Sequence, residues 1–173
     1  MKSRKQNLEK YISEQDISRR VKEISNEIAP LYCNKNPILI GILNGSFIFM
    51  SDLIRHLNID CEVDFIKISS YVGKKSSGTI DMSKGLDLDI KNRSVIIVED
   101  IIDSGKSINY LYKYISNLDP KDIAVISLLA KKSASKLNFN IDFIGFEISS
   151  EFVVGYGLDF NQKLRNLKSI YKL

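Results

Sequence analysis

The stretch VEDIIDSGKS places three carboxylates, Glu99, Asp100 and Asp103, directly before a turn made of Ser, Gly, Lys and Ser. Backbone N–H groups at the start of a helix bind phosphate groups, and nearby serine hydroxyls add further donors. We therefore expect residues 104–107 to hold a phosphate monoester through their amides and hydroxyls.

This turn is not a P-loop, because that motif requires a Gly five positions before the Gly of Gly-Lys-Ser, where this chain has Asp100. Glu99 and Asp100 would repel a phosphate, but they suit vicinal hydroxyls or a hydrated Mg²⁺. A ribose 5-phosphate satisfies both groups, and Asp103 lies between them, placed to act on whatever joins the sugar. The alternative is an acidic turn before an ordinary helix cap, which leaves this density of polar residues unexplained.

The elements around this stretch predict an α/β fold with a central, mostly parallel, twisted sheet flanked by helices. Short apolar runs alternate with amphipathic segments, as in such sheets, and ligands bind at the carboxyl ends of their strands. One run, at 61–69, alternates imperfectly, which indicates a bulge or an edge position. The predicted strands are 37–43, 61–69, 94–99, 123–129 and 141–146, and predicted helices follow at 47–57 and 105–118.

The first predicted helix begins near Ser13, where Ser-Glu-Gln-Asp resembles a capping box. Apolar residues then recur at helical spacing and should face the core. The predicted core face is Ile17, Val21, Ile24, Ile28 and Leu31.

Composition indicates one ordinary globular domain spanning residues 1–173, with 44% hydrophobic and 27% charged residues. No apolar run reaches the roughly 18 residues of a membrane span, and the N-terminus lacks the apolar region of a secretory signal, so we expect a cytoplasmic protein without a membrane partner. The net charge of +4 does not call for a nucleic-acid partner. Cys33 and Cys61 have no metal-like spacing, and we assign no role to His56, the single histidine.

The segment VIIVEDIIDSGKS resembles the phosphoribosyl pyrophosphate (PRPP) motif of type I phosphoribosyltransferases, in the form found in hypoxanthine-guanine phosphoribosyltransferases. The tail FVVGYGLD, followed by Arg165-Asn166-Leu167, is similar to the base-binding segment of that subgroup. SLLAKK and DFIGFE also match it, and the resemblance covers about residues 10–170.

The resemblance implies transfer of a phosphoribosyl group from PRPP to hypoxanthine or guanine, which yields IMP or GMP and pyrophosphate and requires Mg²⁺. Asp103 would take or share the purine N7 proton, and Lys131 would hydrogen-bond O6. Phe152 would stack on the ring, while Val153 would contact its edge. By themselves, Lys131 fits a solvated charge, and Phe152 fits the core.

The remaining implied roles concern PRPP, the metal, the lid and the assembly. A small hood formed by the terminal segments and a mobile lid loop beginning at Ser70 and Tyr71 would complete the fold, and the enzyme would be a homodimer or homotetramer. The lid falls in residues 70–85, a segment rich in Gly, Ser and Lys whose composition by itself fits a mobile hairpin equally well. Relatives hold the Leu43–Asn44 peptide bond cis in some states, so we expect unusual backbone there. The implied ligands are Asp103, Ser104, Gly105, Lys106 and Ser107 for the 5′-phosphate, Glu99 and Asp100 for the ribose, Leu43, Asn44, Gly45 and Arg165 for pyrophosphate, Asp159 for the purine site, and Glu99, Asp100 and Asp159 for Mg²⁺.

Two departures and two alternatives accompany this reading. Asn44 stands where many relatives carry Lys or Arg in the pyrophosphate loop, so the loop would bind through its backbone amides. Ser135 stands where some relatives have an Arg near pyrophosphate, which bears on the affinity for PRPP. A regulator of the same fold that binds RNA would be expected to have a basic face and to lack Lys131 and the FVVGYGLD tail. An enzyme that prefers xanthine, or that accepts 6-oxopurines broadly, is chemically close, and this alternative stays open.

Overall fold

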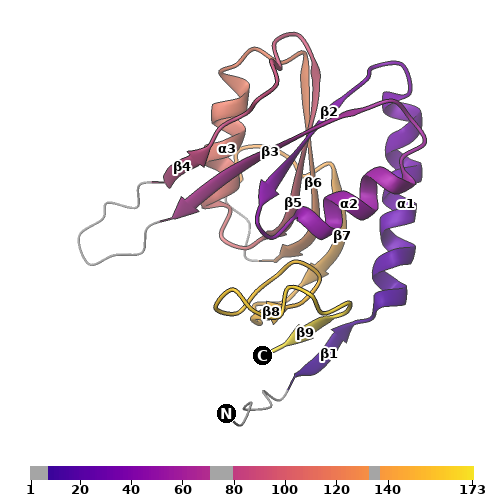
Figure 1. The fold of residues 1–173 in the computed structure, drawn as a ribbon, viewed down its shortest axis with the longest axis vertical. Coiled ribbons are helices and arrows are strands. Elements are labelled where there is room, and N and C mark those ends of the chain that lie inside the picture. Colours follow the sequence, from indigo (N-terminus) through magenta and orange to yellow (C-terminus); the bar gives the residue numbers. More distant parts are fainter. Residues whose placement is uncertain (1–7, 71–79, 133–136) are drawn as a thin grey trace.

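A six-stranded sheet forms the centre of the molecule (Figure 1), as described by a computed structural model for residues 8–70, 80–132 and 137–173. Its inner pairings are parallel, and only β4 joins it antiparallel, against β3. The predicted mostly parallel α/β fold is therefore confirmed. In spatial order the strands are β4 (Ile80–Lys84), β3 (Glu62–Ser70), β2 (Ile38–Leu43), β5 (Ser94–Ile102), β6 (Asp122–Lys131) and β7 (Phe143–Ile148).

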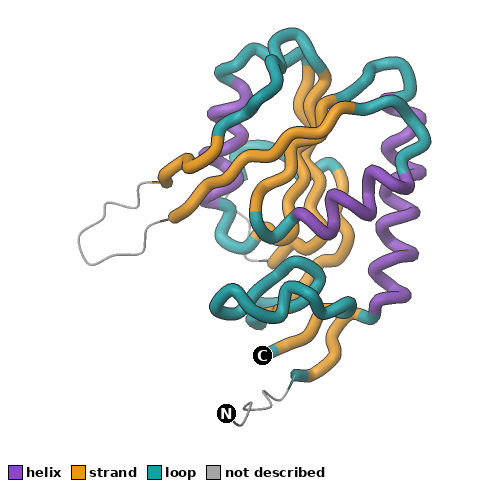
Figure 2. The backbone as a smooth tube through the Cα atoms, viewed as in Figure 1, coloured by secondary structure: helices purple, strands orange, loops and turns teal. Residues whose placement is uncertain are grey.

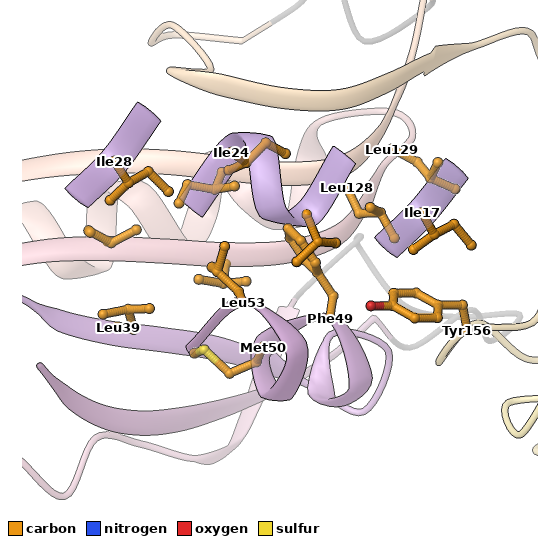
Figure 3. Packing of buried hydrophobic residues seen from close by; sticks show 14 of the residues in the cluster. Ile17, Ile24, Ile28, Leu39, Phe49, Met50, Leu53, Leu128, Leu129 and Tyr156 are labelled. Atoms are coloured by element: carbon orange, nitrogen blue, oxygen red, sulfur yellow. The ribbon is translucent and has the colours of Figure 1, made fainter. Parts of the chain in front are cut away.

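Helices cover both faces of this sheet, which is why its central strands read as continuous apolar runs. On one face, α1 (Glu14–Tyr32) and α2 (Phe47–His56) pack in the α1/α2 core, which is drawn in Figure 3. On the other face, α3 (Lys106–Ser116) packs in a second core. Neighbouring strand residues divide between the two, with Ile96 in the first core and Ile97 in the second.

Helix α1 begins as predicted, with Ser13 as its N-cap, and Ser13 Oγ accepts a hydrogen bond from the backbone N–H of Asp16 at 3.1 Å. Four of the five predicted core residues are buried. Leu31 was predicted wrongly, since it is 54% exposed, and Tyr32 is buried instead. Leu31 and Tyr32 follow Ile28 by three and four residues, so either position can continue its face of the helix. In the structure, Tyr32 is the one that turns toward the core.

Strand β5 is longer than predicted and ends at Ile102, so Glu99 and Asp100 lie inside it. Parallel pairing with β6 continues past the acidic pair because it uses backbone groups, whatever the side chains. The imperfect strand at 61–69 is β3, which is not an edge strand. Its pairing with β4, a strand that was not predicted, shifts register between Lys67 and Ile68, as a bulge does.

A separate three-stranded sheet joins the two ends of the described chain, in the order β1-β9-β8. Its strands are β1 (Glu9–Ile12), β8 (Val153–Val154) and β9 (Ile170–Lys172). Together with Phe152, which precedes β8, and the loop between β8 and β9, which Figure 2 shows as mostly irregular, these strands form the predicted hood. In the parts of the chain that the structure describes, no helix is long and apolar enough to cross a membrane.

Candidate active site

The stretch that carries three carboxylates borders a cavity of about 230 Å³ at the carboxyl ends of β2 and β5. The structure brings most of the predicted phosphate, ribose and pyrophosphate residues together here. Lys106 is exposed and is not among the described residues that line the cavity. The predicted residues in the lining are Leu43, Gly45, Glu99, Asp100, Asp103, Ser104, Gly105 and Ser107.

The turn into α3 depends on Gly105, which has a φ of 78° and serves as the helix N-cap. Other residues are strained in this left-handed region. A Cβ at this position would also lie 2.7 Å from Leu137 Cδ2. The glycine thus lets α3 begin beside the cavity, where its first N–H groups favour a phosphate.

Glu99 and Asp100 are buried side by side, with 9% and 7% of their surfaces exposed. Burial raises the pKa of Glu99 well above its usual range, and the neighbouring Asp100 raises it further. Burial also raises the pKa of Asp100, against the lowering effect of its hydrogen bond with Glu99. A cation or hydroxyl donors that satisfied these carboxylates would favour their charged forms.

The acidic pair fits Mg²⁺ that arrives with a substrate. Within the described ranges, no three His, Cys, Asp or Glu side chains converge on one metal position. Mg²⁺ usually keeps several waters and binds one or two protein carboxylates together with substrate phosphates. Glu99 and Asp100 match that pattern, whereas a metal held by protein alone would need more ligands.

The loop after β2 is pressed closely against this pair. A Cβ on Gly45 would lie 1.8 Å from Asp100 Oδ2, so only glycine fits. Ser46 Oγ donates a hydrogen bond to the carbonyl of Ile42 at 2.6 Å, which ties the loop back to its strand. The Leu43–Asn44 peptide bond is cis, which confirms the expected unusual backbone.

A second cavity, of about 330 Å³, opens between this loop and the hood. It shares Gly45, Asp100, Ile101 and Asp103 with the first, so the two form one continuous cleft. The predicted purine-site residues gather here. Its other lining residues are Asn44, Lys131, Phe152, Val153, Leu158, Asp159 and Arg165.

Lys131 Nζ lies 2.9 Å from Asp103 Oδ2, although the two residues are 28 positions apart. The Lys131 side chain is only 10% exposed, so it is not the solvated charge that its Lys-Lys context suggested. Asp103 is 61% exposed. The cleft therefore presents a covered ammonium group next to an accessible carboxylate.

Aromatic and charged groups of the hood complete the cleft. Phe152 is 53% exposed, and its ring meets that of Phe160 edge-on, with centroids 6.1 Å apart. Asp159 Oδ1 pairs with Arg165 at 2.7 Å, and its other oxygen accepts the backbone N–H of Gln162. Both oxygens of the Asp159 carboxylate therefore already have partners in the protein. Its binding of Mg²⁺ stays a prediction.

Some predicted residues fall outside the cleft or outside the described chain. Ser70 is the last residue of β3, whereas Tyr71, most of the predicted lid and Ser135 lie outside the described residues. Ile101 and Leu158, which line the second, purine-side cavity, were not predicted from the sequence. Both side chains are apolar, and the sequence carries no signal that separates them from core residues.

Comparisons with known proteins identify the family to which the chain belongs. Residues 6–161 match the phosphoribosyl transferase domain family. The hypoxanthine-guanine phosphoribosyltransferase of Aquifex aeolicus is 43% identical over 166 residues, which cover 95% of this chain and 93% of that protein. The hypoxanthine phosphoribosyltransferase of Escherichia coli is 41% identical over 172 residues, which cover 98% of this chain and 97% of that protein.

Solved structures show the same likeness. A Bacillus anthracis hypoxanthine-guanine phosphoribosyltransferase has a TM-score of 0.89 at 37% identity, over 95% of this chain and 98% of that chain. The Trypanosoma cruzi hypoxanthine phosphoribosyltransferase in complex with the product IMP has a TM-score of 0.89 at 33% identity, over 100% of this chain and 97% of that chain. By sequence and fold over nearly its whole length, the chain belongs to the hypoxanthine-guanine phosphoribosyltransferases of the phosphoribosyl transferase family.

Proposed function

We propose that this protein transfers the 5-phosphoribosyl group of PRPP to hypoxanthine or guanine, with Mg²⁺, and releases IMP or GMP and pyrophosphate. One observation carries the proposal beyond family membership. The phosphate-side and purine-side cavities meet at Asp103, which pairs with Lys131 across the junction. A sugar phosphate and a flat base can thus lie end to end, with Asp103 beside the bond that joins them.

The 5′-phosphate of PRPP would bind the turn of residues 104–107 through backbone N–H groups and serine hydroxyls. The ribose hydroxyls would lie over Glu99 and Asp100. Burial raises the pKa of both carboxylates, and the ribose hydroxyls or a cation would favour the charged forms, which accept hydrogen bonds. The sugar would therefore be held at both ends, with its C1 directed toward the purine side.

Pyrophosphate would bind the Leu43-Asn44-Gly45 loop, with Arg165 as a nearby cation in the same cleft. Mg²⁺ at Glu99 and Asp100, and a second ion that Asp159 would help to hold, would neutralise the leaving group. Asn44 leaves the loop without a basic side chain, so the backbone amides are its main donors. The chain's own part in this step is to hold the leaving group in line and to exclude water.

The base would lie between Phe152 and the end of β6, with Val153 at its edge. The Lys131 ammonium group offers only donors, and O6 of hypoxanthine or guanine is an acceptor. When Lys131 turns to O6, Asp103 loses its partner and becomes free to accept the purine N7 proton. A purine nitrogen then bonds to C1 of the ribose, and the C1–O bond to pyrophosphate breaks.

The decisive experiment incubates the protein with PRPP and Mg²⁺ and separately with hypoxanthine, guanine, xanthine and adenine, and follows nucleotide formation. Hypoxanthine and guanine should react, and chelation of Mg²⁺ should stop the reaction. Adenine should not react, because its 6-amino group would face the donors of Lys131, and sites that hydrogen-bond one group reject a mismatch by up to roughly 10⁴–10⁵-fold. Comparable turnover of adenine would refute the assignment, and a strong preference for xanthine would narrow it.

The cleft favours this function over a regulator that binds nucleotide and RNA without turnover, because Lys131 and residues of the FVVGYGLD tail line it. With such a regulator, the same incubation would form no nucleotide. We also propose a homodimer or homotetramer, which sedimentation equilibrium would test.

A further inference from the structure

A buried tyrosine of the hood is hydrogen-bonded to the helix that follows the pyrophosphate loop. Tyr156 is 6% exposed, and its hydroxyl donates to Asp52 Oδ2 of α2 at 2.5 Å. Its ring belongs to the α1/α2 core, and Figure 3 shows it entering from the hood side beyond Phe49 and Ile17. Burial, and then the Asp52 carboxylate, raise the pKa of Tyr156 far above its ordinary value, so the hydroxyl remains a donor.

The backbone beside Tyr156 is held equally tightly. The N–H of Tyr156 donates to the carbonyl of Leu167 at 2.7 Å, and the N–H of Gly157 donates to the carbonyl of Arg165 at 3.0 Å. Arg165 Nη1 in turn donates to the carbonyl of Gly157 at 2.7 Å. Tyr156 thus belongs to the same bonded loop as Arg165 and, through it, Asp159.

This loop lies directly on the pyrophosphate loop. A Cβ on Gly157 would lie 2.1 Å from the carbonyl oxygen of Gly45, so the two backbones are in contact. Gly45 is itself pressed against Asp100. The contacts between the hood and the segment 43–56 therefore include Gly157 on Gly45 and Tyr156 on Asp52. The contact of Gly157 with Gly45 reaches the loop that would bind pyrophosphate. The hydrogen bond from Tyr156 to Asp52 sets the position of the hood relative to that loop.

We infer that Tyr156, with Asp52 as its acceptor, is a positioning residue that keeps the purine-binding hood in register with the pyrophosphate loop. Neither side chain is among the described residues that line the two cavities of the cleft. The pair therefore acts through Gly157, Gly45 and Arg165. Loss of the hydrogen bond lets the hood shift, and affinity for the purine and for pyrophosphate falls together, while the site of the 5′-phosphate on β5 and α3 is left intact.

Tyr156→Phe is the primary test because it removes a single oxygen. This inference rests on the proposed function, so the wild-type protein is assayed first, and turnover of hypoxanthine with PRPP decides that function. A misplacement of about 1 Å can cost about 10²-fold, and we expect Tyr156→Phe to lower kcat/KM for hypoxanthine by about 10- to 100-fold. Calorimetric binding of Mg²⁺-pyrophosphate should weaken by about 10-fold on the same ground, and binding of ribose 5-phosphate should stay within about twofold.

The acceptor gives an independent pair of variants. Asp52→Asn keeps an oxygen that can accept from Tyr156 and should restore most of the affinity that Asp52→Ala loses. Asp52 also accepts a hydrogen bond from the exposed Arg55, so Arg55→Gln is the control for that contact. Tyr32→Phe is the control for deletion of a hydroxyl from a buried tyrosine, since Tyr32 ends α1 at the far end from the hood. Both controls should bind and turn over like the wild type.

The results separate positioning from general stability. The inference is supported if kcat/KM for hypoxanthine and the affinity for pyrophosphate fall together while binding of ribose 5-phosphate is intact. It is also supported if the Tyr156→Phe/Asp52→Ala double variant loses no more than the more impaired of the two single variants. Wild-type affinity in Tyr156→Phe, or equal weakening of all three ligands, overturns it. If Tyr156→Phe does not fold, the comparison of Asp52→Asn with Asp52→Ala decides alone. Because binding of pyrophosphate needs no turnover, a failure of this inference can be told apart from a failure of the proposed reaction.

Discussion

Replacement of Lys131 by methionine tests how the protein recognises the base. Methionine keeps an unbranched chain of similar length and removes the ammonium group. In the structure this group is 2.9 Å from Asp103 and belongs to a side chain that is only 10% exposed. The substitution therefore changes hydrogen bonding in the cleft more than it changes packing.

The size of the effect follows from two opposing contributions. A hydrogen bond from a charged donor to O6 contributes about 1.5–3 kcal/mol. To make it, the wild type separates Lys131 from Asp103, which is 61% exposed, and such a pair contributes about 0–1 kcal/mol. The difference, about 0.5–3 kcal/mol of transition-state stabilisation, predicts a fall in kcat/KM for hypoxanthine of about 2- to 150-fold.

Steady-state kinetics with each substrate varied in turn checks this prediction. The KM for PRPP should stay within about threefold, since a rise confined to one substrate indicates lost binding of that substrate alone. Lys132→Met is the matched control, because Lys132 is the exposed neighbour on the same strand end. The melting temperature should change by less than about 4 °C, as expected for a pair of this strength. If Lys131→Met weakened PRPP as much as hypoxanthine, Lys131 could not be the O6 donor.

Three further predictions concern Asp103 as the general base, the pyrophosphate loop and the stability of the protein at alkaline pH. Asp103→Asn should lower kcat by about 10²–10⁴-fold with little change in PRPP binding, and single-turnover kinetics within a few-fold of wild type would exclude Asp103 as the base. Gly45→Ala should leave the circular dichroism spectrum unchanged but lower kcat/KM by about 10²-fold, because its Cβ would lie 1.8 Å from Asp100 Oδ2; normal activity would mean that the loop adapts freely. Burial raises the pKa of Tyr32 to about 12, so the unfolded chain ionises first and stability should fall as the pH rises from about 10 to about 12. Urea titrations should show a smaller loss in Tyr32→Phe, with Tyr110→Phe at an exposed tyrosine as control, and equal losses in both would contradict the role of burial.

The phosphate half of the cleft was predictable because its residues are neighbours in the sequence. Glu99, Asp100, Asp103 and the turn after them lie on one strand and one helix start, so local rules place them together. The same rules misplaced the strand end, since pairing with β6 carried β5 on to Ile102. Side-chain type indicates chemistry well, but it does not determine where backbone pairing stops.

The purine half was predictable only through the family resemblance. Lys131 sits at the end of β6, while Phe152 and Asp159 belong to the hood, and no periodicity links these segments. The ion pairs Lys131–Asp103 and Asp159–Arg165 arise from tertiary packing. Two hood strands, of two and three residues, are too short to show a pattern of their own.

The hood also differs from the rest of the molecule in how easily it can open. Strand β1 pairs with β9, and β9 with β8, through short ladders between opposite ends of the described chain, whereas β5 and β6 pair along most of their length at the centre of the large sheet. Local unfolding favours segments with few backbone hydrogen bonds, so the hood should open at a lower free energy than the central strands. Such an opened state would still carry the phosphate turn and the acidic pair but would have lost its purine pocket. Fluctuation of one small sheet would therefore leave the phosphate half of the cleft available at times when the purine half is not.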